Sequence, residues 1–76
     1  MYTVKFWYNG FAGEKFEGIR HYDEVMAKEV SQSLSKGTQS GFVMFPASNY
    51  EDEGEDDHFM LVIPVNKIVK IVIDIE

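Results

Sequence analysis

Apolar side chains recur at every second position near both ends of the chain, and this period of two constrains the fold more than any other feature. In residues 2–9, one set of alternate positions, which we call a phase, is apolar and consists of Tyr2, Val4, Phe6 and Tyr8. Residues 66–76 again have one wholly apolar phase, which consists of Val69, Ile71, Ile73 and Ile75. This pattern is typical of strands that bury one face in an antiparallel sheet. We therefore expect a strand at each end of the chain.

Residues 23–37 have the pattern of a single helix. Asp23 is a suitable N-cap for a helix over residues 24–36, and Gly37 suits the C′ position that would end it. The apolar side chains of this segment recur at intervals of four, at Met26, Val30 and Leu34. We expect the helix to pack this apolar stripe against the strands.

Three further segments predict strands, residues 14–22, 41–47 and 58–65. The glycine-rich residues 9–13 favour a turn, so the first two strands are expected to form a hairpin. Because the alternation of the second strand changes phase near Gly18, we expect a β-bulge at that point.

Together these elements predict one α+β domain over residues 1–76, with the order ββαβββ. We expect a strongly bent antiparallel sheet or a small open β-barrel, with the helix across one end. The predicted core consists of Val4, Phe6, Phe16, Met26, Val30, Leu34, Phe42, Met44, Leu61, Ile63, Val69, Ile71 and Ile73.

The chain of 76 residues contains no cysteine, which limits how so small a domain is stabilised. A core of this size supplies only about 3–5 kcal/mol, and disulfides and thiolate zinc sites are excluded. Ile68 and Val72 are apolar residues on the otherwise charged phase of the last segment. We therefore expect a homo-oligomer with Ile68 and Val72 at its interface. The sequence shows neither a signal-peptide pattern nor an apolar run of membrane-spanning length, which predicts a cytoplasmic protein.

The formal net charge of −6 equals the charge of one short segment, because the rest of the chain has seven acids and seven bases. The segment contains Glu51, Asp52, Glu53, Glu55, Asp56 and Asp57. One interpretation is a solvated connection that keeps two apolar strands soluble. Another is a partner loop that imitates nucleic-acid phosphates and binds a basic site on another protein. The segment does not match the pattern of a calcium-binding loop that starts at Asn49, because Met60 occupies the position of the bidentate glutamate.

Catalytic motifs are not recognisable in the sequence. There is no Gly-x-Ser-x-Gly motif, no phosphate-binding glycine loop and no metal-ligand spacing around His21 or His58. We expect a protein that is not an enzyme and that has no catalytic residues, cofactor or metal.

Lys5, Trp7 and Asn9 share the outward phase of the first strand. A lysine beside a tryptophan on a sheet surface can contact a phosphate while the ring stacks on a base. These three residues are therefore the candidate nucleic-acid site. The alternative is that Trp7 covers an end of the barrel or lies in a subunit contact.

The C-terminal residues 58–76 resemble the last two strands of small SH3-like barrels, including the Sm group, with residues 63–66 as the turn and isoleucines in the closing strand. In Sm-like rings these strands pair between subunits, so the resemblance implies an oligomer. The Sm signature motifs are not present, and no RNA-binding residue is carried over. In size and acidity the chain is also similar to small inhibitors encoded by phages.

The sequence thus favours a non-catalytic binding module, a homo-oligomer of Sm-like or SH3-like type that recognises nucleic acid or another ligand. The alternative function is a small acidic inhibitor that presents residues 51–57 to a basic site on a partner protein. The acidic balance of the whole chain disfavours non-specific binding to nucleic acid and to anionic membranes, but it does not exclude a local basic face.

Overall fold

The computed structural model describes residues 1–49 and 59–75. Its elements, in chain order, are β1 (Tyr2–Asn9), β2 (Lys15–Tyr22), α1 (Glu24–Ser40), β3 (Phe42–Phe45), β4 (Leu61–Pro64), the 3₁₀ turn η2 (Val65–Lys67) and β5 (Ile68–Ile75). The predicted α+β class and the order ββαβββ are confirmed. The described strands form two antiparallel sheets, and neither is closed into a barrel.

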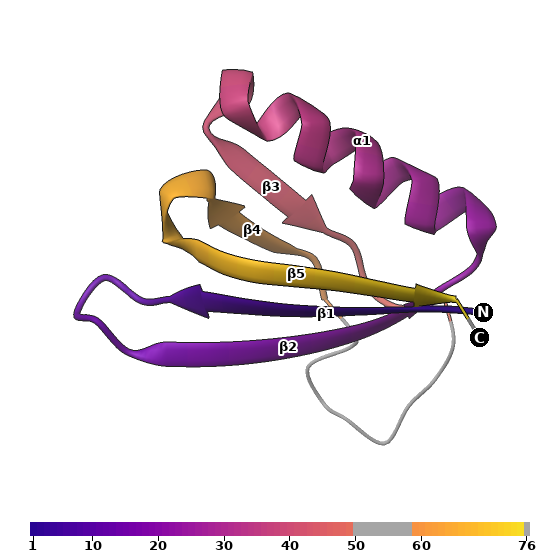
Figure 1. Ribbon diagram of the computed structural model, residues 1–76, viewed down its shortest axis with the longest axis horizontal. Helices are drawn as coiled ribbons and strands as arrows, with labels where there is room; N and C mark the ends of the chain where they lie inside the picture. The colour runs from indigo at the N-terminus through magenta and orange to yellow at the C-terminus, as the bar shows by residue number, and fades with distance from the viewer. Residues whose placement is uncertain (50–58, 76) are drawn as a thin grey trace.

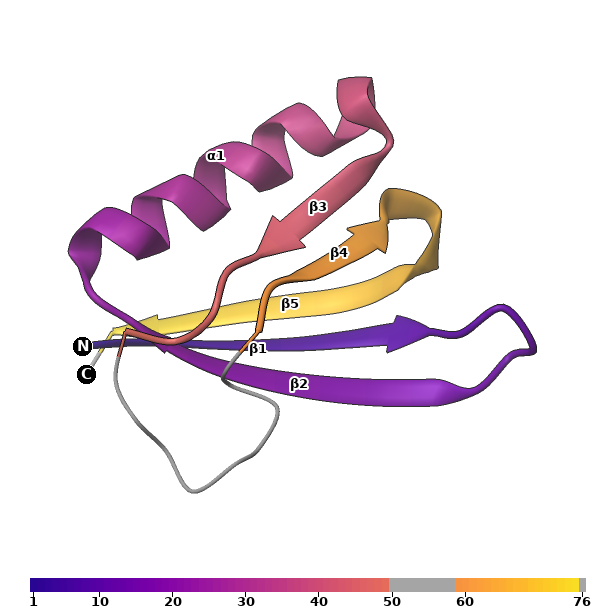
Figure 2. The same cartoon turned by 180° about the vertical axis from the view of Figure 1, so that it is seen from behind.

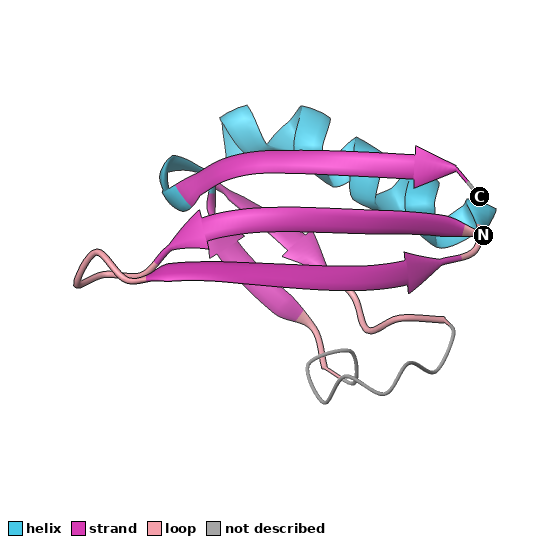
Figure 3. Cartoon of the chain, turned by 60° about the horizontal axis from the view of Figure 1, so that its bottom comes forward, coloured by secondary structure: helices cyan, strands magenta, loops and turns pink. Residues whose placement is uncertain are grey.

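The larger sheet has three strands in the order β2-β1-β5, and β3 and β4 form a separate two-stranded ribbon. The ribbon and α1 lie on the same side of the larger sheet, as two opposite views show (Figures 1 and 2). We call that side of the larger sheet the inner face. The other side, the outer face, has the three strands in front of every other described element (Figure 3).

The hairpin between β1 and β2 closes over Gly10–Glu14, where the Gly10 amide donates to the Glu14 carbonyl at 2.8 Å and Gly13 has a φ of 85°. The predicted β-bulge near Gly18 is wrong, because the pairing of β1 with β2 runs without a shift from Tyr2 to Asn9. Gly18 instead leaves room for the Phe6 ring, since a Cβ at position 18 would overlap that ring. The change of phase in the sequence therefore reflects an outward-facing Ile19 and not a change in register.

The helix starts as predicted and ends later than predicted. The Met26 amide donates to Asp23 Oδ1 at 2.9 Å, which confirms the N-cap. Helix α1 continues to Ser40 and ends at Gly41, which has a φ of 83° and donates its amide to the Gly37 carbonyl at 2.9 Å. Gly37 is therefore not the C′ residue. It is buried inside the helix, where a Cβ would lie only 3.1 Å from a Val43 methyl group.

The core lies between the inner face, the ribbon and α1. Its buried apolar residues are Val4, Phe6, Tyr22, Ala27, Val30, Val43, Phe45 and Ile63. The prediction was correct for Val4, Phe6, Val30 and Ile63, and Met26, Leu34, Leu61 and Ile71 pack partly against this core. It was wrong for Phe16, Phe42, Met44, Val69 and Ile73, which are all exposed.

Three of these errors, at Phe42, Met44 and Val69, arise because the side chains that face the core are one position away from those predicted. In β3 the buried residues are Val43 and Phe45, and the Phe45 ring stacks on Phe6 with centroids 4.0 Å apart. In β5 the register with β1 shifts by one residue beside Trp7, so that the pairing skips Val69. Because a shift of one residue reverses which side chains face the core, Val69 is exposed.

Candidate binding face

The outer face is built from alternate residues of the three strands. Lys5 lies between Ile19 of β2 and Val72 of β5, and Trp7 occupies the next row. Successive residues of a strand point to opposite sides, so the burial of Val4 and Phe6 on the inner face fixes Lys5 and Trp7 on the outer one. The period-two pattern of β1 therefore determines directly which side chains this face presents.

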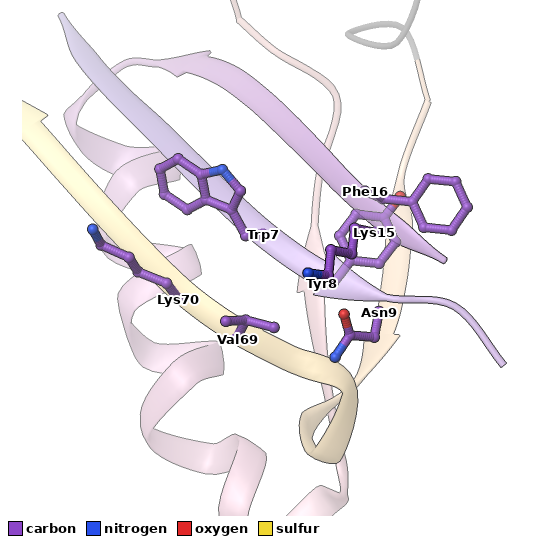
Figure 4. A pocket seen from close by; sticks show the side chains of 7 residues that line it. All are labelled: Trp7, Tyr8, Asn9, Lys15, Phe16, Val69 and Lys70. Atoms are coloured by element: carbon purple, nitrogen blue, oxygen red, sulfur yellow. The ribbon is translucent and has the colours of Figure 1, made fainter. Parts of the chain in front are cut away.

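Trp7 lies in the middle strand at one end of the outer face and is half-buried. Lys70 of β5 pairs with it across the sheet, and the Lys70 Nζ lies 5.4 Å from the centre of the Trp7 ring. This distance is within the range of a cation–π contact. A shallow pocket surrounds the ring, also lined by Asn9, Lys15 and Val69 (Figure 4).

The predicted site residues lie together, because Lys5, Trp7 and Asn9 follow one another on the outer face of β1. The structure adds two lysines that the sequence analysis missed. Lys15 enters because the hairpin register sets it opposite Asn9, and Lys70 enters because β5 pairs with β1. Their spacing along the chain contains no signal of this proximity, which depends on the register of both strand pairs. We call Lys5, Trp7, Lys15 and Lys70 the Trp7 site.

The charge around the Trp7 site differs in sign from that of the whole chain. All seven lysine and arginine residues lie in the described residues, together with only six of the thirteen acids. The Trp7 site itself contains three lysines, and Glu17 of β2 lies opposite Trp7. The face that surrounds the tryptophan is therefore locally basic although the chain is acidic.

A buried arginine is a feature of the inner face that the sequence did not indicate. Arg20 is fully buried, with its guanidinium 5.7 Å from the Phe6 ring and 5.9 Å from the Phe59 ring. It donates to the carbonyl oxygens of Ile19 at 3.1 Å and of Phe59 at 3.4 Å. Arg20 therefore connects β2 to the chain just before β4, and it is a packing residue rather than part of the outer face.

The other predicted site residues are placed as follows. Val72 is half-buried on the outer face beside Lys5, whereas Ile68 pairs with Tyr8 and packs against the core. The proposed interface role of both residues stays a prediction. The acidic partner loop, residues 51–57, lies outside the described residues, as does His58.

The described residues contain neither a candidate metal site nor a candidate membrane span. In residues 1–49 and 59–75, no three histidine, aspartate or glutamate side chains are grouped closely enough to hold a metal ion. The helix in that part of the chain lacks the length and apolar character needed to cross a membrane.

Comparisons with protein families, with curated proteins and with solved structures found no match for this chain. The resemblance of the C-terminal strands to SH3-like and Sm-like barrels therefore stays a prediction.

Proposed function

We propose that this protein is a non-catalytic binding module that holds single-stranded nucleic acid on its outer face, at the Trp7 site. The observation that supports this proposal is the position of Trp7, which lies half-buried on the outer face with Lys5, Lys15 and Lys70 around it. A sheet that presents an aromatic ring among cations combines the two contacts that single strands need.

Each contact has a distinct physical basis. An aromatic side chain stacks on any base, and this contact is worth about 1–3 kcal/mol per base. Lysines bind phosphates electrostatically and without regard to sequence, so their contribution falls as salt increases. Lys70 already lies over the Trp7 ring. An incoming base would therefore compete with the Lys70 ammonium group for the ring, or it would stack on the part of the ring that Lys70 does not cover.

Single strands fit this face better than duplexes do. Stacking requires an unpaired base that can leave its neighbours, and a duplex offers such bases only at its ends. The Trp7 ring lies on the surface of a sheet, and no described helix or ribbon on that side could enter a groove (Figure 3). We therefore expect a short oligothymidylate to bind more tightly than the matching duplex.

Trp7 is the only tryptophan of the chain, so its fluorescence reports on the site without a label. We expect oligothymidylate to quench this fluorescence at low salt. If all three lysines contact phosphates, the logarithm of the binding constant should fall with a slope of about −2 against the logarithm of salt concentration. Absence of quenching at low salt would overturn the proposal.

Variants separate stacking from charge when binding is followed by the anisotropy of a labelled oligonucleotide. Trp7→Ala should weaken binding by roughly 5- to 150-fold, and Trp7→Phe should restore part of the loss. Lys5→Gln should weaken binding and reduce the salt slope, whereas Glu17→Gln should strengthen binding. Lys36→Gln on α1 is the matched control, and it should have no effect. Equal losses in Lys5→Gln and Lys36→Gln would contradict the assignment of the site.

A further inference from the structure

The two edges of the three-stranded sheet differ in how they are covered. At the β2 edge, the His21 amide donates to the Ser48 hydroxyl, and the Asn49 amide donates to the His21 carbonyl, both at 2.9 Å. At the other edge, β5 runs for eight residues, and no strand in residues 1–49 or 59–75 pairs with its far side. Three apolar side chains of this edge strand are exposed, those of Val69, Ile73 and Ile75.

A long apolar edge strand is a template for pairing with another strand, and proteins commonly block such pairing with charged side chains, lysine above all. The charges of β5 are arranged differently. Lys70 and Asp74 have opposite signs, both are exposed on the outer face, and each lies two residues from Val72. In an antiparallel pair of two β5 strands centred on Val72, Lys70 of each copy lies directly opposite Asp74 of the other.

We propose that two copies of this chain form a dimer by antiparallel pairing of their β5 edges, with the twofold axis at Val72. This pairing would join the two sheets into one sheet of six strands. It would place two Lys70–Asp74 pairs on the outer face, where opposite charges on facing residues stabilise a sheet by about 0.2–1 kcal/mol each. The proposal does not depend on nucleic-acid binding.

The inner face supports the same register. Centring on Val72 places Ile71 opposite Ile73 of the second copy on the inner side of the joined strands. It also sets Val69, at the register shift, opposite Ile75, so apolar residues face each other at both ends of the pairing. Moving the register by two residues one way would set Val72 opposite Lys70 and Asp74 opposite Ile68. Moving it the other way would set Lys70 opposite Glu76 but leave Asp74 opposite Val72, so neither register pairs both charges of β5. Helix α1 lies behind the plane of the sheet (Figure 3), and no strand in residues 1–49 or 59–75 pairs with the free edge of β5.

The dimer would also extend the outer face. Both Trp7 sites would lie on the same side of one continuous sheet, because a twofold axis perpendicular to a sheet keeps each face on its own side. The predicted interface role of Val72 follows from this arrangement, since Val72 meets its own copy at the axis. Ile68 would lie at the far end of the paired strands and, because it packs against the core, would contribute less.

Sedimentation velocity without nucleic acid tests the pairing, at protein concentrations of roughly 10–100 μM. The wild type should sediment as a dimer. Lys70→Glu sets the introduced carboxylate opposite Asp74 of the second copy, and Asp74→Lys sets the introduced ammonium opposite Lys70. The dimer of either variant alone should therefore have a dissociation constant at least about tenfold higher than that of the wild-type dimer.

Mixing the two single variants distinguishes the register from a general loss of association. One chain of each kind pairs opposite charges at both positions, so an equimolar mixture of Lys70→Glu and Asp74→Lys should form dimers. The double variant K70E/D74K should form dimers by itself. Circular dichroism of each variant confirms folding. A monomeric wild type at about 100 μM, or single variants that associate as the wild type does, would overturn the proposal, and so would a mixture that stays monomeric.

Discussion

On the inner face of β1, Val4 and Phe6 have no exposed surface, whereas Lys5 and Trp7, their neighbours in sequence, are half-buried on the outer face. The inner residues are covered by the β3–β4 ribbon and by α1, and Phe6 also stacks on Phe45. Within residues 1–49 and 59–75, the outer residues have neighbouring side chains of the same sheet around them and no second layer over them. One strand thus supplies both the centre of the core and the centre of the Trp7 site, and the two roles alternate residue by residue.

The largest expected difference between the two faces is in stability, when one residue on each face is substituted. Phe6→Ala removes a fully buried ring and should lower the free energy of unfolding by about 3–5 kcal/mol. Trp7→Ala should cost no more than about 1–2 kcal/mol, because part of its ring is already in contact with water. Chemical denaturation measures both values. A larger loss for Trp7→Ala than for Phe6→Ala would contradict the assignment of the two faces.

Gly18 and Ile19 allow the same comparison on β2. Gly18→Ala inserts a methyl group against the Phe6 ring and should destabilise the fold by about 1–3 kcal/mol. Ile19→Ala on the outer face removes a partly exposed side chain and should cost about 1 kcal/mol or less. Thermal unfolding followed by circular dichroism compares the two variants. If Gly18→Ala were neutral, the close packing of Phe6 on β2 would be wrong.

Neutralising the acidic segment should have the smallest of these effects, a modest gain in oligonucleotide binding at the outer face. Replacement of the six acids at positions 51–57 by Asn and Gln removes the whole formal net charge. At low salt, reduced long-range repulsion should strengthen oligonucleotide binding by roughly two- to tenfold, and this gain should disappear as salt screens it. Anisotropy titrations at two salt concentrations measure the change.

The same variant tests the alternative function. If the acidic segment is a partner loop, its neutralisation should abolish binding to a basic partner protein, whereas a solvated connection should lose only solubility. Weaker oligonucleotide binding by the neutralised variant would contradict a repulsive role for the acids.

The sequence was sufficient to predict the elements whose pattern is local. The alternation of β1 predicted its two faces, and Asp23 predicted the start of α1. The predicted end of α1 was wrong because both Gly37 and Gly41 can terminate a helix. Only the packing of Gly37 against Val43 explains why Gly37 lies inside the helix. Local patterns identify a strand or a cap, but they do not choose between equivalent stop signals.

Features that depend on pairing between distant segments could not be predicted. The short run 42–45 is apolar at every position, so nothing in it indicates that Val43 and Phe45 face Phe6 while Phe42 and Met44 do not. The shift at Val69 arises only where β5 meets β1. For the same reason the candidate site was half predicted, since Lys5 and Trp7 share a strand whereas Lys15 and Lys70 join them through register.

Chemical-shift mapping by NMR compares the two faces of β1 in a single experiment. During a titration with oligothymidylate at low salt, we expect shifts of the Trp7 indole and of the amides around Lys5, Lys15 and Lys70. The amides of α1 and of the β3–β4 ribbon should stay unchanged. Shifts confined to α1 or to the ribbon, or no shifts at all, would contradict a nucleic-acid site on the outer face.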